Sequence, residues 1–146
     1  MSKNLYSSMI SVSYLYHATV GACYFVAFRS LYNQYPGLFG YNGLLPGDIF
    51  ISKISDQLST GSTLYEIFQS NIQLDCLLDY LFIIGTSISI FIVTGFHSSL
   101  LFLIAFICYL LIYTVGQEVF LSFQWDILLL EVGFLSIFTS PYLLYP

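Results

Sequence analysis

The residues best equipped for chemistry are the acidic side chains of the segment 116–134. Glu118, Asp126 and Glu131 lie there between long apolar runs, and the whole chain has only eight acidic residues. Two carboxyl groups held close together can share a proton and act as general acid and base. A carboxylate also costs several kcal/mol to place in hydrocarbon unless a polar group meets it. We therefore expect neighbouring elements to hold this segment in place.

Helical geometry argues against a catalytic pair of carboxylates. At about 100° per residue, Asp126 lies about 140° around a helix from Glu131. Gln124 lies seven residues before Glu131 and shares its face. We interpret Gln124, Asp126 and Glu131 as polar contacts that fix a helix against its neighbours, and Trp125 as an anchor at the membrane boundary. The alternative is a substrate or proton site at Glu131, as in part of a transporter.

The rest of the chain offers no catalytic companions. His17 and His97 are 80 residues apart and do not predict a haem or metal pair; we expect His17 to bond a backbone carbonyl and His97 to be exposed. The sequence has no dinucleotide-binding glycine motif, no P-loop, no His-Glu-x-x-His, no Gly-x-Ser-x-Gly and no Cys-x-x-Cys. We expect a non-enzymatic protein without a cofactor or metal, although so apolar a chain is compatible with bound lipids.

The composition predicts an all-α, polytopic membrane protein. Of the 146 residues, 58% are hydrophobic and only 8% are charged, whereas soluble domains are about a quarter charged. Only three residues are Lys or Arg, so the basic cluster that a nucleic acid requires is absent. We expect other membrane protein subunits and lipids as partners, and no nucleic acid.

About four spans fit the apolar runs, all within one transmembrane domain covering residues 1–146. At about 1.5 Å per residue the longer runs can cross the hydrocarbon core. The run 100–115 is short, so we expect that span to be untilted or to lie in a locally thin region of the membrane. The predicted spans are residues 12–32, 74–94, 100–115 and 123–142. Asp75 and Asp79, at the start of the second span, are expected to face solvent. Small residues that favour close helix contacts are Ala18, Gly21, Ala22, Gly85 and Ser89.

A folded loop, residues 33–73, is predicted between the first and second spans. Its turn signals include Gly40, Asn42, Gly43 and Pro46. Residues 48–58 have the pattern of an amphipathic helix lying in the membrane interface, and a second short helix is predicted through residue 68. The loop is either a binding loop or a compact connector, and the sequence favours neither.

Three segments, taken in order, resemble the amino-terminal membrane region of lipase maturation factors. They are Tyr-Phe-Val-Ala-Phe at 24–28, Gly-Tyr-Asn-Gly-Leu-Leu-Pro at 40–46 and Ser-Phe-Gln-Trp-Asp-Ile-Leu-Leu-Leu-Glu-Val-Gly-Phe-Leu-Ser-Ile-Phe at 122–138. The resemblance implies a multispan protein of the endoplasmic reticulum that helps secreted lipases fold, without a catalytic triad of its own. The later spans and the large luminal domain of that family would follow the region compared.

Two functions are compatible with these features. In the first, the chain is a structural or accessory subunit of a larger membrane complex, in the mitochondrial inner membrane or the endoplasmic reticulum. The shortage of charge favours this hypothesis, because it suits a chain enclosed by other hydrophobic subunits. In the second, the chain is a reduced or split assembly chaperone of the lipase-maturation-factor type in the endoplasmic reticulum.

Overall fold

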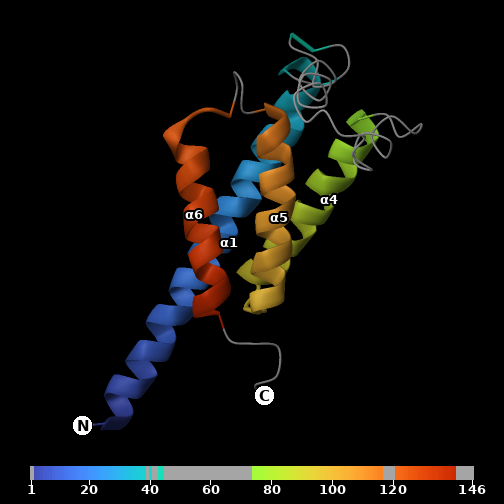
Figure 1. Ribbon diagram of the computed structural model, residues 1–146. Coiled ribbons are helices and arrows are strands. Elements are labelled where there is room, and N and C mark those ends of the chain that lie inside the picture. The colour runs from blue at the N-terminus through green and yellow to red at the C-terminus, as the bar shows by residue number, and fades with distance from the viewer. Residues whose placement is uncertain (1, 39, 41–42, 45–73, 117–120, 141–146) are drawn as a thin grey trace, which may run out of the picture.

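The computed structural model describes residues 2–38, 40, 43–44, 74–116 and 121–140. Over these residues the architecture is all-helical, without a strand. The helices are α1 (Ser2–Leu38), α4 (Leu74–Val93), α5 (Ser99–Gly116) and α6 (Gln124–Thr139). Figure 1 shows them side by side as one bundle, which agrees with the predicted fold class.

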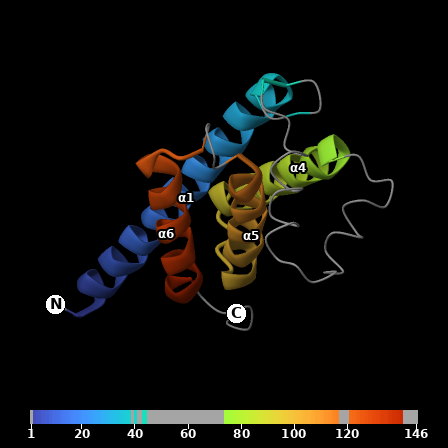
Figure 2. The ribbon, with the colours of Figure 1, turned by 45° about the horizontal axis from the view of Figure 1, so that its top comes forward.

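Helix α1 is the long diagonal element of the bundle. Its 37 residues correspond to about 55 Å, whereas the 16 residues of α6 correspond to about 24 Å. Its amino-terminal turns therefore extend past the other helices, as Figures 1 and 2 show. Its main contacts are with α4, and α5 packs between α4 and α6. The chain thus builds two antiparallel pairs, α1 with α4 and α5 with α6.

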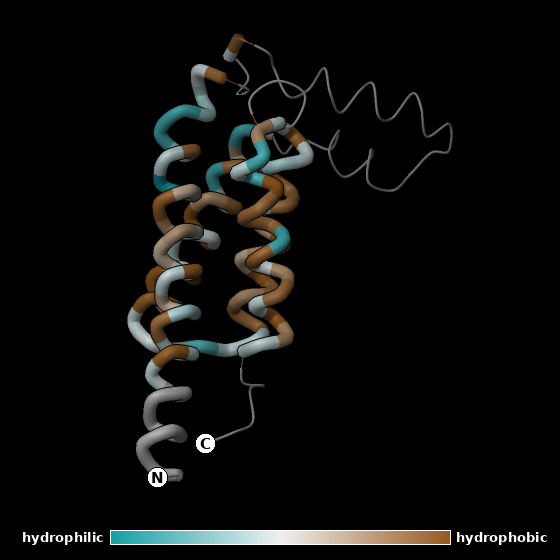
Figure 3. The backbone as a smooth tube through the Cα atoms, turned by 90° about the vertical axis from the view of Figure 1, so that its left-hand side faces the viewer, coloured by the Kyte–Doolittle hydropathy of each residue, from teal (hydrophilic) through white to brown (hydrophobic). Residues whose placement is uncertain are grey.

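Two of the described helices are long and apolar enough to cross a membrane, Asp75–Val93 in α4 and Ser99–Gly116 in α5. Large apolar side chains point outward from α4, α5 and α6, among them Ile83, Ile107 and Leu135. Much of the backbone tube of the bundle is brown in Figure 3, the colour of hydrophobic residues. Such a surface suits lipid, so the protein is an integral membrane protein. Of the four predicted spans, the second and the third are supported in this way.

The connection between α4 and α5 is a tight glycine turn. Gly95 has a φ of 109°, a backbone conformation that residues with a side chain rarely adopt. The Phe96 N–H donates to the Phe91 carbonyl at 3.1 Å and the Gly95 N–H to the Ile92 carbonyl at 3.1 Å. These are the two hydrogen bonds of a Schellman helix end, and the rings of Phe91 and Phe96 pack together across it. Helix α4 of the predicted hairpin therefore ends in a hydrogen-bonded turn.

The first helix is longer than predicted. It continues through Pro36 to Leu38, so the first residues of the expected loop are helical. Pro36 cannot donate a helical hydrogen bond to the preceding turn, which is consistent with the helix ending two residues later. The ring of Tyr35 stacks on Phe82 of α4 with centroids 5.0 Å apart. The chain then reverses direction, with the Gly43 N–H donating to the Gly40 carbonyl at 2.8 Å.

Most of the predicted loop lies outside the described residues. This applies to Asn42, to Pro46 and to both of the short helices expected within residues 48–68. Gly40 is buried beside Pro36, and Gly43 is half-buried in the turn. Whether the loop binds a partner or only connects two helices stays a prediction.

Close contact between α1 and α4 is made at glycines. A Cβ added to Gly21 would meet Ile92 at 2.6 Å, and one added to Gly85 would meet the ring of Phe28 at 2.5 Å. Ser89 is buried beside Gly85 and donates to its carbonyl at 2.7 Å. Ala22, by contrast, is exposed because it lies about 100° around α1 from Gly21. Ala18 is half-buried. The expectation that Ala22 makes a close helix contact is therefore not met within the described residues.

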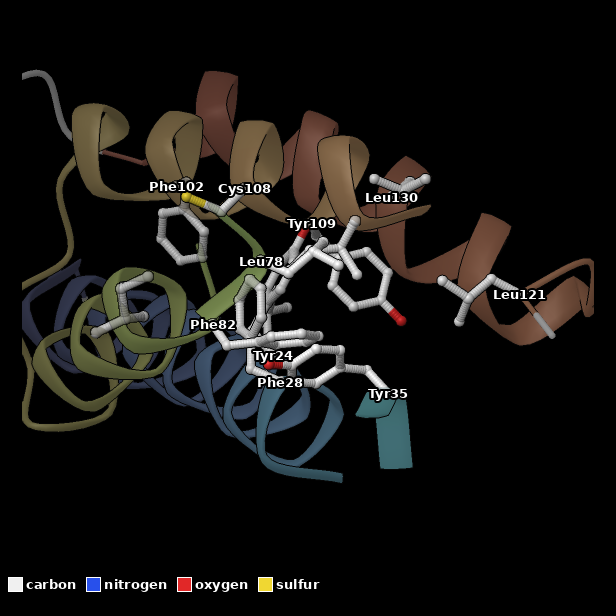
Figure 4. Packing of buried hydrophobic residues seen from close by; sticks show 13 residues of the cluster. Tyr24, Phe28, Tyr35, Leu78, Phe82, Phe102, Cys108, Tyr109, Leu121 and Leu130 are labelled. Carbon is white, nitrogen blue, oxygen red and sulfur yellow. The ribbon is translucent and has the colours of Figure 1, made fainter. Parts of the chain in front are cut away.

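Aromatic side chains fill the space that the glycines open. Tyr24, Phe28 and Tyr109 are fully buried and pack with ring centroids 5.5–6.0 Å apart, as in Figure 4. The buried apolar cluster around them consists of Val20, Tyr24, Phe28, Tyr35, Leu78, Phe82, Ile92, Phe102, Cys108, Tyr109, Ile112, Leu121 and Leu130. The core therefore runs through all four helices.

Among the described glycines, Gly133 leaves the least space for a side chain, because Tyr24 lies against it. The Tyr24 hydroxyl donates to the Leu129 carbonyl of α6 at 3.2 Å, and a Cβ at Gly133 would lie only 1.7 Å from the Tyr24 Oη. Only glycine fits at this position, because any side chain would occupy the place of the phenol. This contact links α1 to α6.

We predict that Gly133→Ala destabilises the protein by about 1–3 kcal/mol, because the added methyl group overpacks the bundle and displaces Tyr24. Thermal unfolding of the detergent-solubilised chain should show a lower Tm. Gly37→Ala is the matched control, since no atom lies within 4 Å of a Cβ there, and its Tm should be unchanged or slightly higher. Equal Tm values for the two variants would contradict the packing described for Gly133.

Candidate functional site

The two described carboxylates of the segment 116–134, Asp126 and Glu131, point in different directions. Asp126 is half-buried in the first turn of α6, where a negative charge complements the helix dipole. It accepts a 2.6 Å hydrogen bond from the hydroxyl of Tyr109 on α5. Asp126 therefore joins two helices, and it lies too far around α6 from Glu131 to act as a pair.

Glu131 lies on the outer face of α6. It is exposed and makes no hydrogen bond or ion pair within the part of the chain that the structure describes. Gln124 shares this face and is also exposed, as is Trp125, with 78% of its surface accessible. Together with Ile127 and Leu128 these residues line an open hollow of about 340 Å³.

The outer position of Glu131 and Gln124 has a simple geometric reason. The side of α6 that faces the bundle carries Leu130, Gly133 and Ser136, which recur at helical spacing and are buried. Glu131 is about 100° further round than Leu130. The predicted contact of Glu131 and Gln124 with neighbouring helices is therefore not made within the described residues, whereas Asp126 does reach a neighbour.

A second tyrosine–carboxylate contact closes the end of the bundle near residues 38 and 74. The Tyr35 hydroxyl of α1 donates to Asp79 Oδ1 of α4. Asp79 is half-buried, so the expectation that it faces solvent was wrong. The reason is that α1 extends beyond its predicted end and brings Tyr35 over α4. Arg29 lies nearby on α1, with its guanidinium 5.8 Å from the centre of the Tyr32 ring.

The opposite end of the bundle holds a histidine cluster, which we define as His17, His97, Tyr16, Ser136 and Thr139. The rings of His17 and His97 have their centroids 5.4 Å apart. Tyr16 and Ser136 share a 3.1 Å hydrogen bond between α1 and α6, and the His17 Nε2 lies 3.3 Å from the Thr139 hydroxyl. The sequence did not predict this contact between the two histidine rings.

His17 is fixed by its own helix. Its exposed fraction is 2%, and its Nδ1 lies 2.8 Å from the Ser13 carbonyl, to which it donates. The predicted bond from His17 to a carbonyl is therefore present. With Nδ1 protonated, Nε2 is left as an acceptor for the Thr139 hydroxyl.

His97 is held differently. It lies in the turn after α4, and Tyr14 packs edge-on against its ring at 4.9 Å. Both ring nitrogens are buried and have no hydrogen-bond partner among residues 2–38, 74–116 and 121–140. The expectation of an exposed His97 was therefore wrong. Burial, with a smaller contribution from the neighbouring His17, holds the pKa of His97 below its ordinary value of 6.5.

The polar groups of the described residues mostly bond one another or the backbone. No group of three or more His, Cys, Asp or Glu side chains in the described parts of the chain could hold a metal ion. His17 lies beside the Thr139 hydroxyl, and neither histidine bonds a carboxylate within the described residues. The two bonded carboxylates accept from tyrosines. A nucleophile, a base and an orienting group do not come together in this arrangement.

The comparisons with known proteins point to one family. The family model described as the lipase maturation factor transmembrane domain matches residues 12–145. Lipase maturation factor 2 of Xenopus tropicalis is 41% identical over 129 residues, covering 81% of this chain and 18% of that protein. Lipase maturation factor 1 of Mus musculus is 35% identical over 129 residues, covering 81% of this chain and 22% of that protein.

The match concerns a limited part of those relatives. The chain spans about a fifth of the length of the curated relatives it matches. No solved structure matches the chain. The matched region includes all the helix contacts described above.

The Tyr109–Asp126 contact predicts a measurable coupling between α5 and α6. Tyr109→Phe and Asp126→Leu should each cost about 1–3 kcal/mol, because each leaves the other polar group without its partner. In the double variant the loss should be clearly smaller than the sum of the single losses. The free energies of unfolding of the four proteins in detergent provide this cycle. Strict additivity would show that the bond contributes nothing.

The position of His97 predicts a loss of stability in acid. Because its pKa is lowered by folding, the unfolded chain binds a proton more readily than the folded chain below about pH 6.5. The Tm should therefore fall as the pH is lowered through about 6.5, and His97→Gln should weaken this dependence. Melting curves between about pH 8 and pH 5.5 test this, with wild-type protein as the reference. If the Tm of His97→Gln fell equally steeply with pH, the loss of stability in acid would be due to other groups.

Proposed function

Because the chain belongs to the lipase maturation factor family, we propose that it is a non-catalytic membrane scaffold that supports the folding or assembly of secreted lipases. We further propose that it acts in the membrane of the endoplasmic reticulum, as the family resemblance implies. The chain corresponds to the transmembrane region of its relatives. It would therefore supply the part of that activity that depends on a rigid membrane-embedded support.

The observation that carries this proposal is how the polar groups of the bundle are used. The hydroxyl groups of Tyr24, Tyr35 and Tyr109 each bond an acceptor on another helix, namely the Leu129 carbonyl, Asp79 and Asp126. A catalytic site would need such groups to be available to a substrate. Here they hold helices together, which favours a scaffold over an enzyme.

A second function is favoured by the outer face of α6. Glu131 and Gln124 are exposed on a face that is otherwise apolar, so this helix is suited to contact another membrane protein. The chain could serve as a structural or accessory subunit of a larger membrane complex. This alternative requires no lipase as a client, and it leaves the organelle open between the endoplasmic reticulum and the mitochondrial inner membrane.

We predict that cells lacking this chain secrete less active lipase although they synthesise the lipase polypeptide normally. Re-expression of the wild-type chain should restore the ratio of lipase activity to lipase mass in the medium. Gly37→Ala should restore it equally, whereas Gly133→Ala should restore less, because its bundle is destabilised.

Native electrophoresis after mild solubilisation separates the two functions. Migration alone or together with immature lipase supports the maturation role. Stoichiometric migration with a large complex free of lipase, together with normal lipase secretion in the absence of the chain, would replace it with the subunit role.

A further inference from the structure

The outer face of α6 carries an acidic residue, Glu131, near the middle of the helix. Lipid hydrocarbon is an unfavourable environment for such a group. Glu131 is the eighth of the 16 residues of α6, about 10 Å along the helix from Gln124. Along α6 it lies between Leu129 and Gly133, the two residues of this helix that Tyr24 approaches in the bundle core. Glu131 is therefore level with the middle of the bundle and not with either end.

The surroundings of Glu131 on this face are apolar. Ile127, Leu128 and Leu135 are 41%, 52% and 57% exposed, and Phe134 and Phe138 are also exposed. A carboxyl group at the centre of a lipid-facing helix is unfavourable and is ordinarily paired or turned to a polar cavity. The short side chain of glutamate cannot reach the interface as the longer Lys and Arg side chains do.

The described part of the chain offers no partner for this group. Arg29 is the only basic residue whose side chain is described, and it lies on α1 over the ring of Tyr32. The sequence as a whole has three basic residues and a formal net charge of −5. The chain thus has fewer basic than acidic groups, and Arg29, the one basic side chain described, is not beside Glu131. This favours a complementary charge on another molecule.

We propose that the outer face of α6 binds a membrane-spanning helix of another protein, and that this helix presents a Lys or Arg side chain to Glu131. Gln124 adds an amide seven residues away on the same face, so the partner helix would be held at two depths. Leu128 lies between them, and the apolar side chains around it would pack against the partner. This inference concerns a membrane partner and does not depend on the proposed role in lipase maturation.

Site-specific photo-cross-linking of the full chain in its native membrane tests the proposal. A benzophenone side chain is placed at Leu128, beside Glu131, or at Ile107 of α5 as the matched control, which is 44% exposed and belongs to another helix. We expect a protein adduct from position 128 and only lipid adducts from position 107. Mass spectrometry should place the cross-linked peptide in an apolar stretch of about 18 residues or more that contains a Lys or Arg.

Changing Glu131 tests the charge itself. With the probe at position 128, Glu131→Gln should lower the adduct yield about tenfold or more, because the partner cation would be left without its counter-charge. Glu131→Lys should abolish the adduct, and replacing the partner's basic residue with Glu should restore it. Both variants should elute and melt like the wild-type chain in detergent, because Glu131 bonds no described residue.

Several outcomes would overturn the proposal. These are adducts to lipid alone at position 128, a cross-linked segment without a basic residue, an adduct with a second copy of this chain, or an undiminished yield with Glu131→Gln. The identity of the cross-linked peptide is obtained with Glu131 unchanged, so this part of the test does not depend on how the variants fold.

Discussion

The contact of Tyr24 with Gly133 is the interaction on which the rest of the bundle depends. In hydrocarbon, helices gain little from burying apolar side chains, because lipid is an equally apolar neighbour. Close packing and hydrogen bonds must therefore hold them together. Tyr24 provides both, since its ring packs against Phe28 and Tyr109 while its hydroxyl bonds the Leu129 carbonyl. Without the space above Gly133, α6 could not approach α1 so closely.

Tyrosine hydroxyls repeat this solution at two other helix pairs. Tyr35 joins α1 to α4 through Asp79, and Tyr109 joins α5 to α6 through Asp126. Each bond satisfies a donor and an acceptor that would be costly to leave unpaired away from water. A chain with so few charges thus uses tyrosine as its main polar link between helices. The histidine cluster has no such carboxylate, and two ring nitrogens of His97 are left without a partner among the described residues.

The sequence predicted the helices better than their contacts. Apolar runs located α4 and α5 to within one residue at each end, because hydrophobic length is a strong local signal. Gly133 was missed because a search for paired small residues favours Gly21 and Gly85, whereas the partner of Gly133 is a bulky tyrosine 109 residues away. The pairing of His17 and His97 could have been inferred. Alternating spans put the start of the first helix and the turn after the second span on the same side of the membrane.

The orientation of the two carboxylates of α6, Asp126 and Glu131, could not be predicted from the sequence. A helix wheel separates Asp126 from Glu131, but it cannot say which of the two faces the core. That choice depends on Gly133 and Ser136, whose small side chains allow the neighbouring helices to approach one side of α6. Asp126 lies close enough to that side to meet Tyr109, and Glu131 does not. Folding and assembly therefore depend on different faces of this helix. A change at Gly133 acts on the bundle itself, whereas a change at Glu131 leaves every described contact intact and acts only on what α6 meets outside.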